Sequence, residues 1–410
     1  MKGALAWPFL RLYILALFFF SANAILNVMI PLRGHDLGAT NATIGIVMGA
    51  YMLTAMLFRP WAGQVIAKVG PIKILRWILI INGFALILYG FTGLEGYFIA
   101  RVMQGVCTAF FSMSLQIGII DALPEEDRSQ GISLYSLFSY IPGIIGPMIA
   151  VGIWQLDNLS YFALTMIIIA ITTGVVGFSA TLHGHDDADT TPAQQEKMPY
   201  GAMTVFLQLF KNPFLLKAGT IMLVASIGFG AVATFIVLYV NKYQVGHASL
   251  FLAVQAITVV FARFFLRQYI PSDGRWHVRF MLGVLGLLTV ALLFIAIGPY
   301  VGGWILYISA VMIGLTQAMV YPTLTSFLSF KLPKVGRNML LGLFIATADL
   351  GVSLGAALMG PIADMVGYAN MYLICGILMA FITLMSIERR PQFIENNVEN
   401  EQARVHFKVS

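Results

Sequence analysis

Long apolar runs separated by short polar links repeat along the whole of this 410-residue chain. About twelve of them are long enough to cross the hydrocarbon core of a bilayer, roughly 30 Å thick, as helices. Charged residues make up only 10% of the chain, against roughly 25% in an average soluble domain, and its mean hydropathy is +0.85. We therefore predict an all-α membrane protein. Its expected spans are 9–31, 44–67, 73–93, 97–121, 130–155, 159–181, 216–240, 248–270, 278–298, 302–328, 338–362 and 367–387.

The longest polar break between these runs, 183–200, is rich in Asp, Gln, Thr and Pro, which is typical of a flexible linker. It divides the twelve spans into two sets of six. We predict four parts, in the order of an N-terminal six-helix bundle, a cytoplasmic linker, a C-terminal six-helix bundle and a cytoplasmic tail. Their limits are 1–182, 183–214, 215–387 and 388–410.

The two sets also resemble weak parallel repeats. The fourth and tenth spans share a glycine followed by small and polar residues, Gly105 to Thr108 and Gly314 to Gln317. The second and eighth spans each carry an arginine, Arg59 and Arg263, ahead of a basic cluster. Repeats of this kind place substrate sites between the two halves, near the middle of the membrane.

The positive charges predict the orientation. If the N-terminus is cytoplasmic, 19 of the 24 Lys and Arg residues lie on or near the cytoplasmic side and only Arg33 and Lys242 lie outside. Both termini are then cytoplasmic. The basic pI near 9.2 follows from this topology and gives no reason to expect a nucleic-acid partner. The first span begins near Phe9 without a cleavage site, so we expect a retained helix rather than a signal peptide.

Several function classes are excluded. Cys107 and Cys375 both lie in apolar runs, so neither a disulfide framework nor a multi-cysteine metal site is expected. No phosphate-binding loop or HExxH motif is present, so we expect neither an enzyme nor an ATP-driven pump, and no cofactor. His183 and His185 lie beside acidic residues, but that is common in flexible linkers, and we predict no metal site.

Asp349 is the only acidic residue deep inside the predicted spans. A carboxylate at that depth is costly and needs a partner, a proton or a function. A low dielectric favours its protonated form, so Asp349 could accept and release a proton or balance a substrate charge. The alternative is a static ion pair with Arg59 or Arg101 that joins the two halves.

Arg101 begins a polar stripe on the fourth span. Gln104, Thr108, Ser112 and Gln116 follow it at helical spacing. A polar stripe in lipid must face protein or water, and arginine can bind carboxylates through two hydrogen bonds. We predict that Arg101 takes part in proton coupling and that Gln104, Ser112 and Gln116 contact substrate. Packing between helices is the alternative.

Other polar side chains within the spans are further candidates for substrate contact. Asn23 and Asn27 lie one turn apart, where lining a cavity and joining helices are equally open interpretations. Tyr140, Gln317 and Tyr321 complete the predicted binding set. Gating is predicted for Arg59, Arg263 and Asp121, with Asp121 as the partner of Arg59.

Local motifs resemble those of the major facilitator superfamily, and the resemblance covers 9–387. The link GQVIAKVGPIK after the second span is similar to the family signature G-x-x-x-D-R/K-x-G-R/K-x-R/K, with Ala67 in place of the aspartate. RVMQG from Arg101 is similar to the R-x-x-x-G motif of proton-coupled members. Gly146-Pro147 resembles the end of the antiporter motif, although the glycines that usually follow are absent.

Longer strings, such as MGAYMLTAMLFRPWAG, resemble exporters of opine-type metallophores, which are small metal-binding zwitterions with several carboxylates. The resemblance implies a secondary transporter in a bacterial cytoplasmic membrane, monomeric and surrounded by lipid, that exports a small molecule in exchange for protons. The alternatives are a multidrug/proton antiporter, a flippase or uptake carrier of an amphiphile, and a receptor that binds a solute without moving it.

Overall fold

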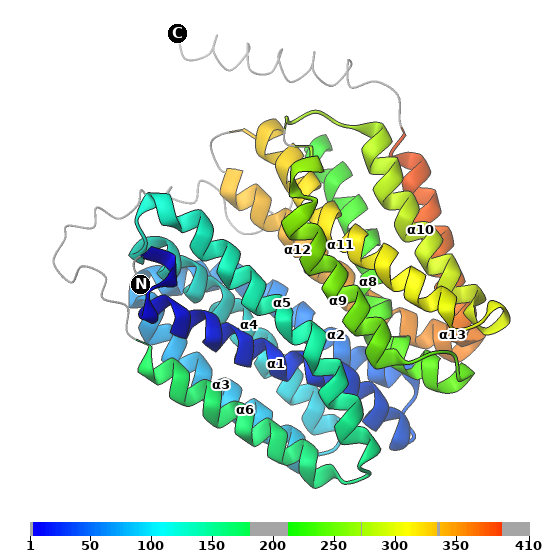
Figure 1. Ribbon diagram of the computed structural model, residues 1–410, viewed down its shortest axis with the longest axis horizontal. Coiled ribbons are helices and arrows are strands. Elements are labelled where there is room, and N and C mark those ends of the chain that lie inside the picture. Colours follow the sequence, from blue (N-terminus) through cyan, green and yellow to red (C-terminus); the bar gives the residue numbers. More distant parts are fainter. Residues whose placement is uncertain (1–2, 181–211, 272, 334–336, 388–410) are drawn as a thin grey trace.

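The computed structural model describes residues 3–180, 212–271, 273–333 and 337–387 (Figure 1). Within these ranges twelve helices are long and apolar enough to cross a membrane and no strand occurs, which confirms the predicted fold class. They are α1 (Trp7–Asp36), α2 (Asn41–Val69), α3 (Pro71–Phe91), α4 (Leu94–Ala122), α5 (Glu125–Gln155), α6 (Leu159–Ser179), α8 (Pro213–Tyr243), α9 (Ala248–Phe265), α10 (Val278–Val301), α11 (Trp304–Lys331), α12 (Arg337–Ala357) and α13 (Met359–Met385). Nearly all of the predicted linker and the whole predicted tail lie outside the described residues.

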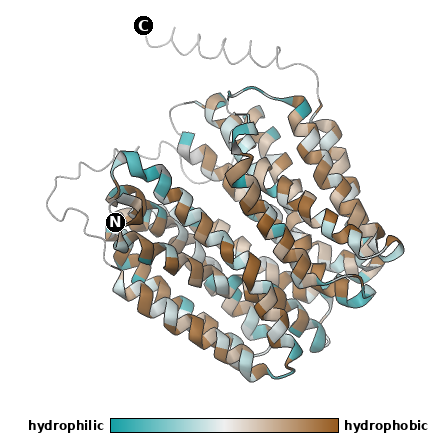
Figure 2. Ribbon diagram, viewed as in Figure 1, coloured by the Kyte–Doolittle hydropathy of each residue, from teal (hydrophilic) through white to brown (hydrophobic). Residues whose placement is uncertain are grey.

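The outer surface of the helices is apolar (Figure 2). Large hydrophobic side chains such as Trp77, Phe84, Val175 and Ile377 are more than half exposed. Burial inside the protein therefore does not account for them, and lipid is the solvent that can.

The helices form two six-helix bundles (Figure 1). In the first, α1 packs on α5 and α6, and α4 packs on α2 and α3. In the second, α8 packs on α12, α11 packs on α9 and α10, and α10 also packs on α13. Four main contacts join the bundles, α2 with α12, α2 with α13, α5 with α9 and α1 with α8. We call the end where α1 and α8 begin the terminal end, and the opposite end the far end.

The glycines shared by the two halves, Gly105 and Gly314, each lie at a close crossing of two helices. Gly105 of α4 lies against the carbonyl of Tyr51 and the side chain of Thr54 on α2. Gly314 of α11 lies against the carbonyl of Gln255 and the side chain of Thr258 on α9. A Cβ atom has no room at either glycine, so each allows a close helix crossing. The predicted repeat is therefore visible as the same crossing in both bundles.

The hydrophobic core divides unevenly between the ends. One cluster joins the far-end half of the first bundle, including Ile25, Met48 and Phe162, to the whole length of the second bundle. A separate cluster around Leu12, Phe111 and Ile119 fills the terminal-end half of the first bundle and contains no residue of the second. Among the described residues the bundles thus share a large core at the far end, while the terminal-end core of the first bundle has no member from the second. A small cluster of Val259, Ala262 and Ala318, against which Tyr140 packs, is a lesser contact between them.

The predicted boundary between the last two spans agrees with the structure. The helix α13 contains a break at Gly367, whose φ of 81° and ψ of 163° are not helical. Leu358, between α12 and α13, keeps helical backbone angles, so residues 359–366 continue the eleventh span. The twelfth span then begins at the break, where the apolar pattern predicts its start.

Candidate functional site

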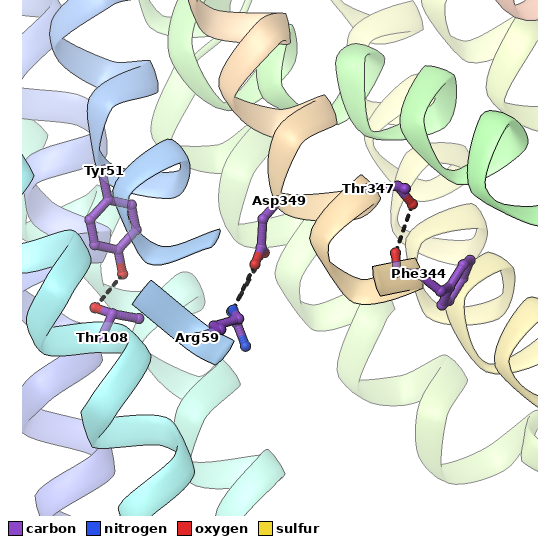
Figure 3. A network of polar contacts seen from close by, with 6 residues as sticks. All are labelled: Tyr51, Arg59, Thr108, Phe344, Thr347 and Asp349. Atoms are coloured by element: carbon purple, nitrogen blue, oxygen red, sulfur yellow. Dashed lines mark hydrogen bonds and ion pairs between the residues drawn. The ribbon is translucent and has the colours of Figure 1, made fainter. Parts of the chain in front are cut away.

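An ion pair between the bundles lies at the centre of the candidate site (Figure 3). Arg59 of α2 places Nε 2.7 Å from Oδ2 of Asp349 on α12, and its Nη2 donates to Oδ1 at 3.5 Å. Nε and Oδ2 are not aligned as a hydrogen bond, and each is buried without a hydrogen-bond partner. The pair is therefore held mainly by the attraction between the two charges, with one long hydrogen bond beside it.

Close helix packing brings the two charges together. One turn beyond Asp349, Ser353 donates from Oγ to the carbonyl of Gly49 at 2.9 Å. Gly49 in turn lies close to the Ser353 carbonyl. Asp349 is only 8% exposed as a result, so its charge is shielded from water on most sides.

The predicted pairing of Arg59 with Asp121 is wrong. Asp121 is exposed in the last turn of α4, and in the described part of the chain the acidic partner of Arg59 is Asp349. The ion-pair interpretation of Asp349 is thus correct in its geometry.

Arg101 is fully buried and is held by neutral groups. Its Nη1 donates to Asn23 Oδ1 at 2.7 Å and its Nη2 to Asn27 Oδ1 at 2.9 Å. The ring of Tyr51 lies 5.2 Å from the guanidinium carbon. No carboxylate contacts Arg101 within the described ranges. Asn23 and Asn27 therefore join α1 to α4, and the arginine charge has no anionic partner in this conformation.

The polar stripe of α4 separates into two groups. Gln104 accepts a hydrogen bond from Tyr89 at 2.7 Å, and Thr108 shares one with the Tyr51 hydroxyl at 2.9 Å (Figure 3). Ser112 and Gln116 are more accessible and interact with Tyr135 of α5. Gln104 and Thr108, nearer the far end, are thus engaged in helix packing. Ser112 and Gln116, nearer the terminal end, retain access to solvent.

The second bundle contributes a similar set. Gln255 donates to Gln317 at 3.1 Å, and the ring of Tyr321 stacks near that of Phe344. Arg263 of α9 lies over the ring of Tyr140 on α5 at 4.3 Å, which joins the bundles on the side opposite the α2–α12 contact.

Arg263 resembles Arg101 in one respect. No carboxylate contacts it among the residues that the structure describes, and its Nε is buried without a hydrogen-bond partner. Among the described residues, Arg101 inside the first bundle and Arg263 between the bundles therefore lack acidic partners, while Arg59 has one.

A cavity of about 580 Å³ opens between the bundles at the far end, away from the Arg59–Asp349 pair. Its walls include Asn41, Lys242, Asp364 and Tyr368, none of which was predicted as a site residue. They lie near the ends of spans, where polar residues are ordinary. In the described ranges no group of three or more His, Cys, Asp and Glu could hold a metal ion, and His183 and His185 lie outside them.

Comparison with known proteins gives a consistent answer. The model of the Major Facilitator Superfamily matches residues 12–339 and 275–409. The staphylopine export protein of Staphylococcus aureus (strain Mu50) is 68% identical over 391 residues, which cover 95% of this chain and 98% of that protein. The quinolone resistance protein NorA of S. aureus (strain MRSA252) is 22% identical over 389 residues, 91% of this chain and 94% of that protein.

Among solved structures, a variant of the nucleoside transporter NupG superposes with a TM-score of 0.77 at 15% identity, covering 93% of this chain and 99% of the other. Identity this low shows a common fold and nothing finer. The family match and the full-length match to an export protein confirm the predicted family resemblance. They also confirm that the protein is a transporter rather than an enzyme. This chain belongs to the Major Facilitator Superfamily.

Proposed function

We propose that the protein exports an opine-type metallophore in exchange for protons. The observation that carries this proposal is the 68% identity to the staphylopine export protein along nearly the full length of both chains. The alignment covers 98% of that protein, so the likeness extends over the whole chain rather than over one motif.

Two arginines, Arg101 and Arg263, support a substrate that carries carboxylates. Arg101 and Arg263 are cations that no described carboxylate contacts. Burying such a charge is costly unless an anion arrives, and a planar guanidinium suits a carboxylate. In this conformation Arg101 is sealed at 0% exposure, so it meets substrate only after the helices around it move.

Asp349 supplies the exchange. The ammonium group of a zwitterion and a proton both need the same carboxylate, so they exclude each other at Asp349. Mutual exclusion at one site is what coupling by exchange requires. Either would have to take the place that Arg59 Nε now holds, 2.7 Å from Oδ2. Displacing the Arg59 contact would then loosen the central link between the bundles.

The direction follows from the proposed topology. The 19 of 24 basic residues that the sequence predicts on the cytoplasmic side favour the terminal end as the cytoplasmic one. The shared core then closes the molecule on the outer side, while the cytoplasmic halves of the bundles share no large core within the described ranges. This is the conformation that would load a solute from the cytoplasm. Rocking of the bundles about the central contacts would release it outside.

Reconstitution into proteoliposomes tests the proposal. We expect export of an opine metallophore to rise when a proton gradient is applied, and Asp349→Asn to abolish that response. Glu95→Gln is the matched control, because Glu95 is an exposed carboxylate in the first turn of α4. Opine transport that ignores the gradient, or an Asp349→Asn variant that responds as the wild type does, contradicts the coupling.

A multidrug/proton antiporter is the second candidate, supported by the full-length likeness to the quinolone resistance protein NorA. A cationic dye in the same vesicles distinguishes the two. Transport of the dye without transport of the opine would favour this candidate, and the arginines would then need another role.

A further inference from the structure

A carboxylate of one bundle holds the first turn of a helix in the other at the far end. Asp364 of α13 accepts from the Asn41 backbone N–H at 3.0 Å and from its Nδ2 at 2.7 Å through Oδ1. Its Oδ2 accepts from the backbone N–H of Ala42 at 2.9 Å. Tyr368 donates from its hydroxyl to Asn41 Oδ1 at 2.6 Å. We call Asn41, Ala42, Asp364 and Tyr368 the far-end gate.

The gate completes the N-terminal capping of α2. The first N–H groups of a helix have no partner within the helix. Thr40, from the same bundle, accepts from the N–H of Thr43, and Asp364 accepts from the two before it. A negative charge is also favoured at a helix N-terminus. Two of these three capping hydrogen bonds therefore come from the opposite bundle and are lost when the bundles part at this end.

The backbones around the gate touch. Gly360 lies against the carbonyl of Asn41, and Gly45 against the carbonyl of Ala356, with no room for a Cβ atom at either glycine. Asp364 itself is exposed and lines the far-end cavity together with Lys242, whose Nζ lies 5.4 Å from the ring centre of Tyr368. Water thus reaches the gate, so its hydrogen bonds can be exchanged for water when the bundles separate.

The turn that contains Asp364 has a counterpart in the first bundle with the same glycine spacing but without the aspartate. Gly360, Asp364 and Gly367 repeat the spacing of Gly63, Ala67 and Gly70 between α2 and α3. Both final glycines have positive φ, 81° at Gly367 and 93° at Gly70, followed by extended ψ. Alanine replaces the carboxylate in the terminal-end copy. Of these two matching turns, only the far-end one can hold a helix N-terminus by charge.

We propose that Asp364, supported by Tyr368, is a positioning residue that favours the conformation closed at the far end. The proposal rests on the alternation of the two bundles proposed above. It assigns to this carboxylate a bias in the resting state of the transporter rather than contact with the transported solute.

The distance between the bundles tests the gate directly. Spin labels on cysteines introduced at Leu156 and Tyr300, which are exposed far-end positions in different bundles, report opening at that end. Both native cysteines are buried and react poorly. We expect Asp364→Ala to increase the ratio of open to closed molecules by about three- to thirtyfold, the range produced by loss of a helix cap. Tyr368→Phe, which removes one hydrogen bond, should give a smaller change in the same direction.

Glu95→Gln removes a far-end carboxylate outside the gate and should leave the distances unchanged. Distances like those of the wild type in Asp364→Ala and Tyr368→Phe overturn the proposal. If Asp364→Ala does not fold, Tyr368→Phe alone decides. No substrate is present in this measurement, so a failure to transport opines leaves its result intact.

Discussion

The interaction energy of the Arg59–Asp349 pair follows from its distance and its burial. At 2.7 Å and an effective dielectric constant of about 20, the attraction is about 6 kcal/mol. The cost of removing both charges from water opposes this attraction. The attraction is also weakened by solvent screening, because the Arg59 side chain is 33% exposed. We therefore expect removal of either partner to lower the free energy of unfolding by about 2 to 3 kcal/mol.

A double-mutant cycle isolates the pair. Asp349→Asn leaves an unpaired guanidinium and Arg59→Gln leaves an unpaired carboxylate, whereas the double variant leaves neither. We expect the double variant to be about 1 to 3 kcal/mol more stable than the sum of the single effects predicts. Unfolding in mixed detergent micelles, followed by intrinsic fluorescence, gives the change in unfolding free energy for each single variant and for the double variant.

The exposed pair Arg33–Asp36 provides the control for this cycle. Its atoms lie 2.8 Å apart, much as in the central pair, but its side chains are 23% and 53% exposed and both belong to α1. Its coupling should be about 0 to 1 kcal/mol. Additive effects at Arg59 and Asp349, or a coupling no larger than in this control, would refute the argument that burial between the bundles makes the charge pair strong.

Three further predictions concern packing and binding. Gly105→Ala should cost about 1 to 3 kcal/mol in unfolding free energy, because a Cβ has no room against α2, whereas Gly83→Ala, which faces open space, should be neutral or stabilising in the same melts. Tyr89→Phe should cost about 1 kcal/mol by leaving buried Gln104 without its donor, and a wild-type stability would contradict this. Arg101→Lys should fold but bind opine substrate at least about tenfold more weakly by calorimetry, because an ammonium group cannot hold two acceptors in one plane; unchanged affinity would remove Arg101 from the binding set.

The number of helices and most of their limits could be predicted because apolar run length is a local property. The boundary at Gly367 is one of these limits, because the twelfth predicted span begins there and the structure breaks the helix at that residue. Polar residues inside spans, such as Asp349 and Arg101, were also recognisable because lipid makes each of them costly.

The sequence could narrow the partner of Asp349 to Arg59 or Arg101, but it could not choose between them. Arg59 and Asp349 are 290 positions apart, and their contact depends on how α2 and α12 are rotated against each other. Asp121 is nearer in sequence but exposed at a helix end. The gate residue Asp364 escaped notice for the opposite reason, because a carboxylate near the end of a span costs little and therefore gives no signal.

The uneven division of the core has a consequence for synthesis of the chain. The terminal-end core around Phe111 contains only residues of the first bundle, so it can be completed before α8 is made. The far-end side chains of the same bundle, such as Met48 and Phe162, join a cluster whose other members come from the second bundle. A nascent chain that has inserted six helices is thus finished at one membrane surface and incomplete at the other. Until α8 through α13 arrive, lipid must cover that apolar surface, and this half-built stage is where misassembly or degradation would begin.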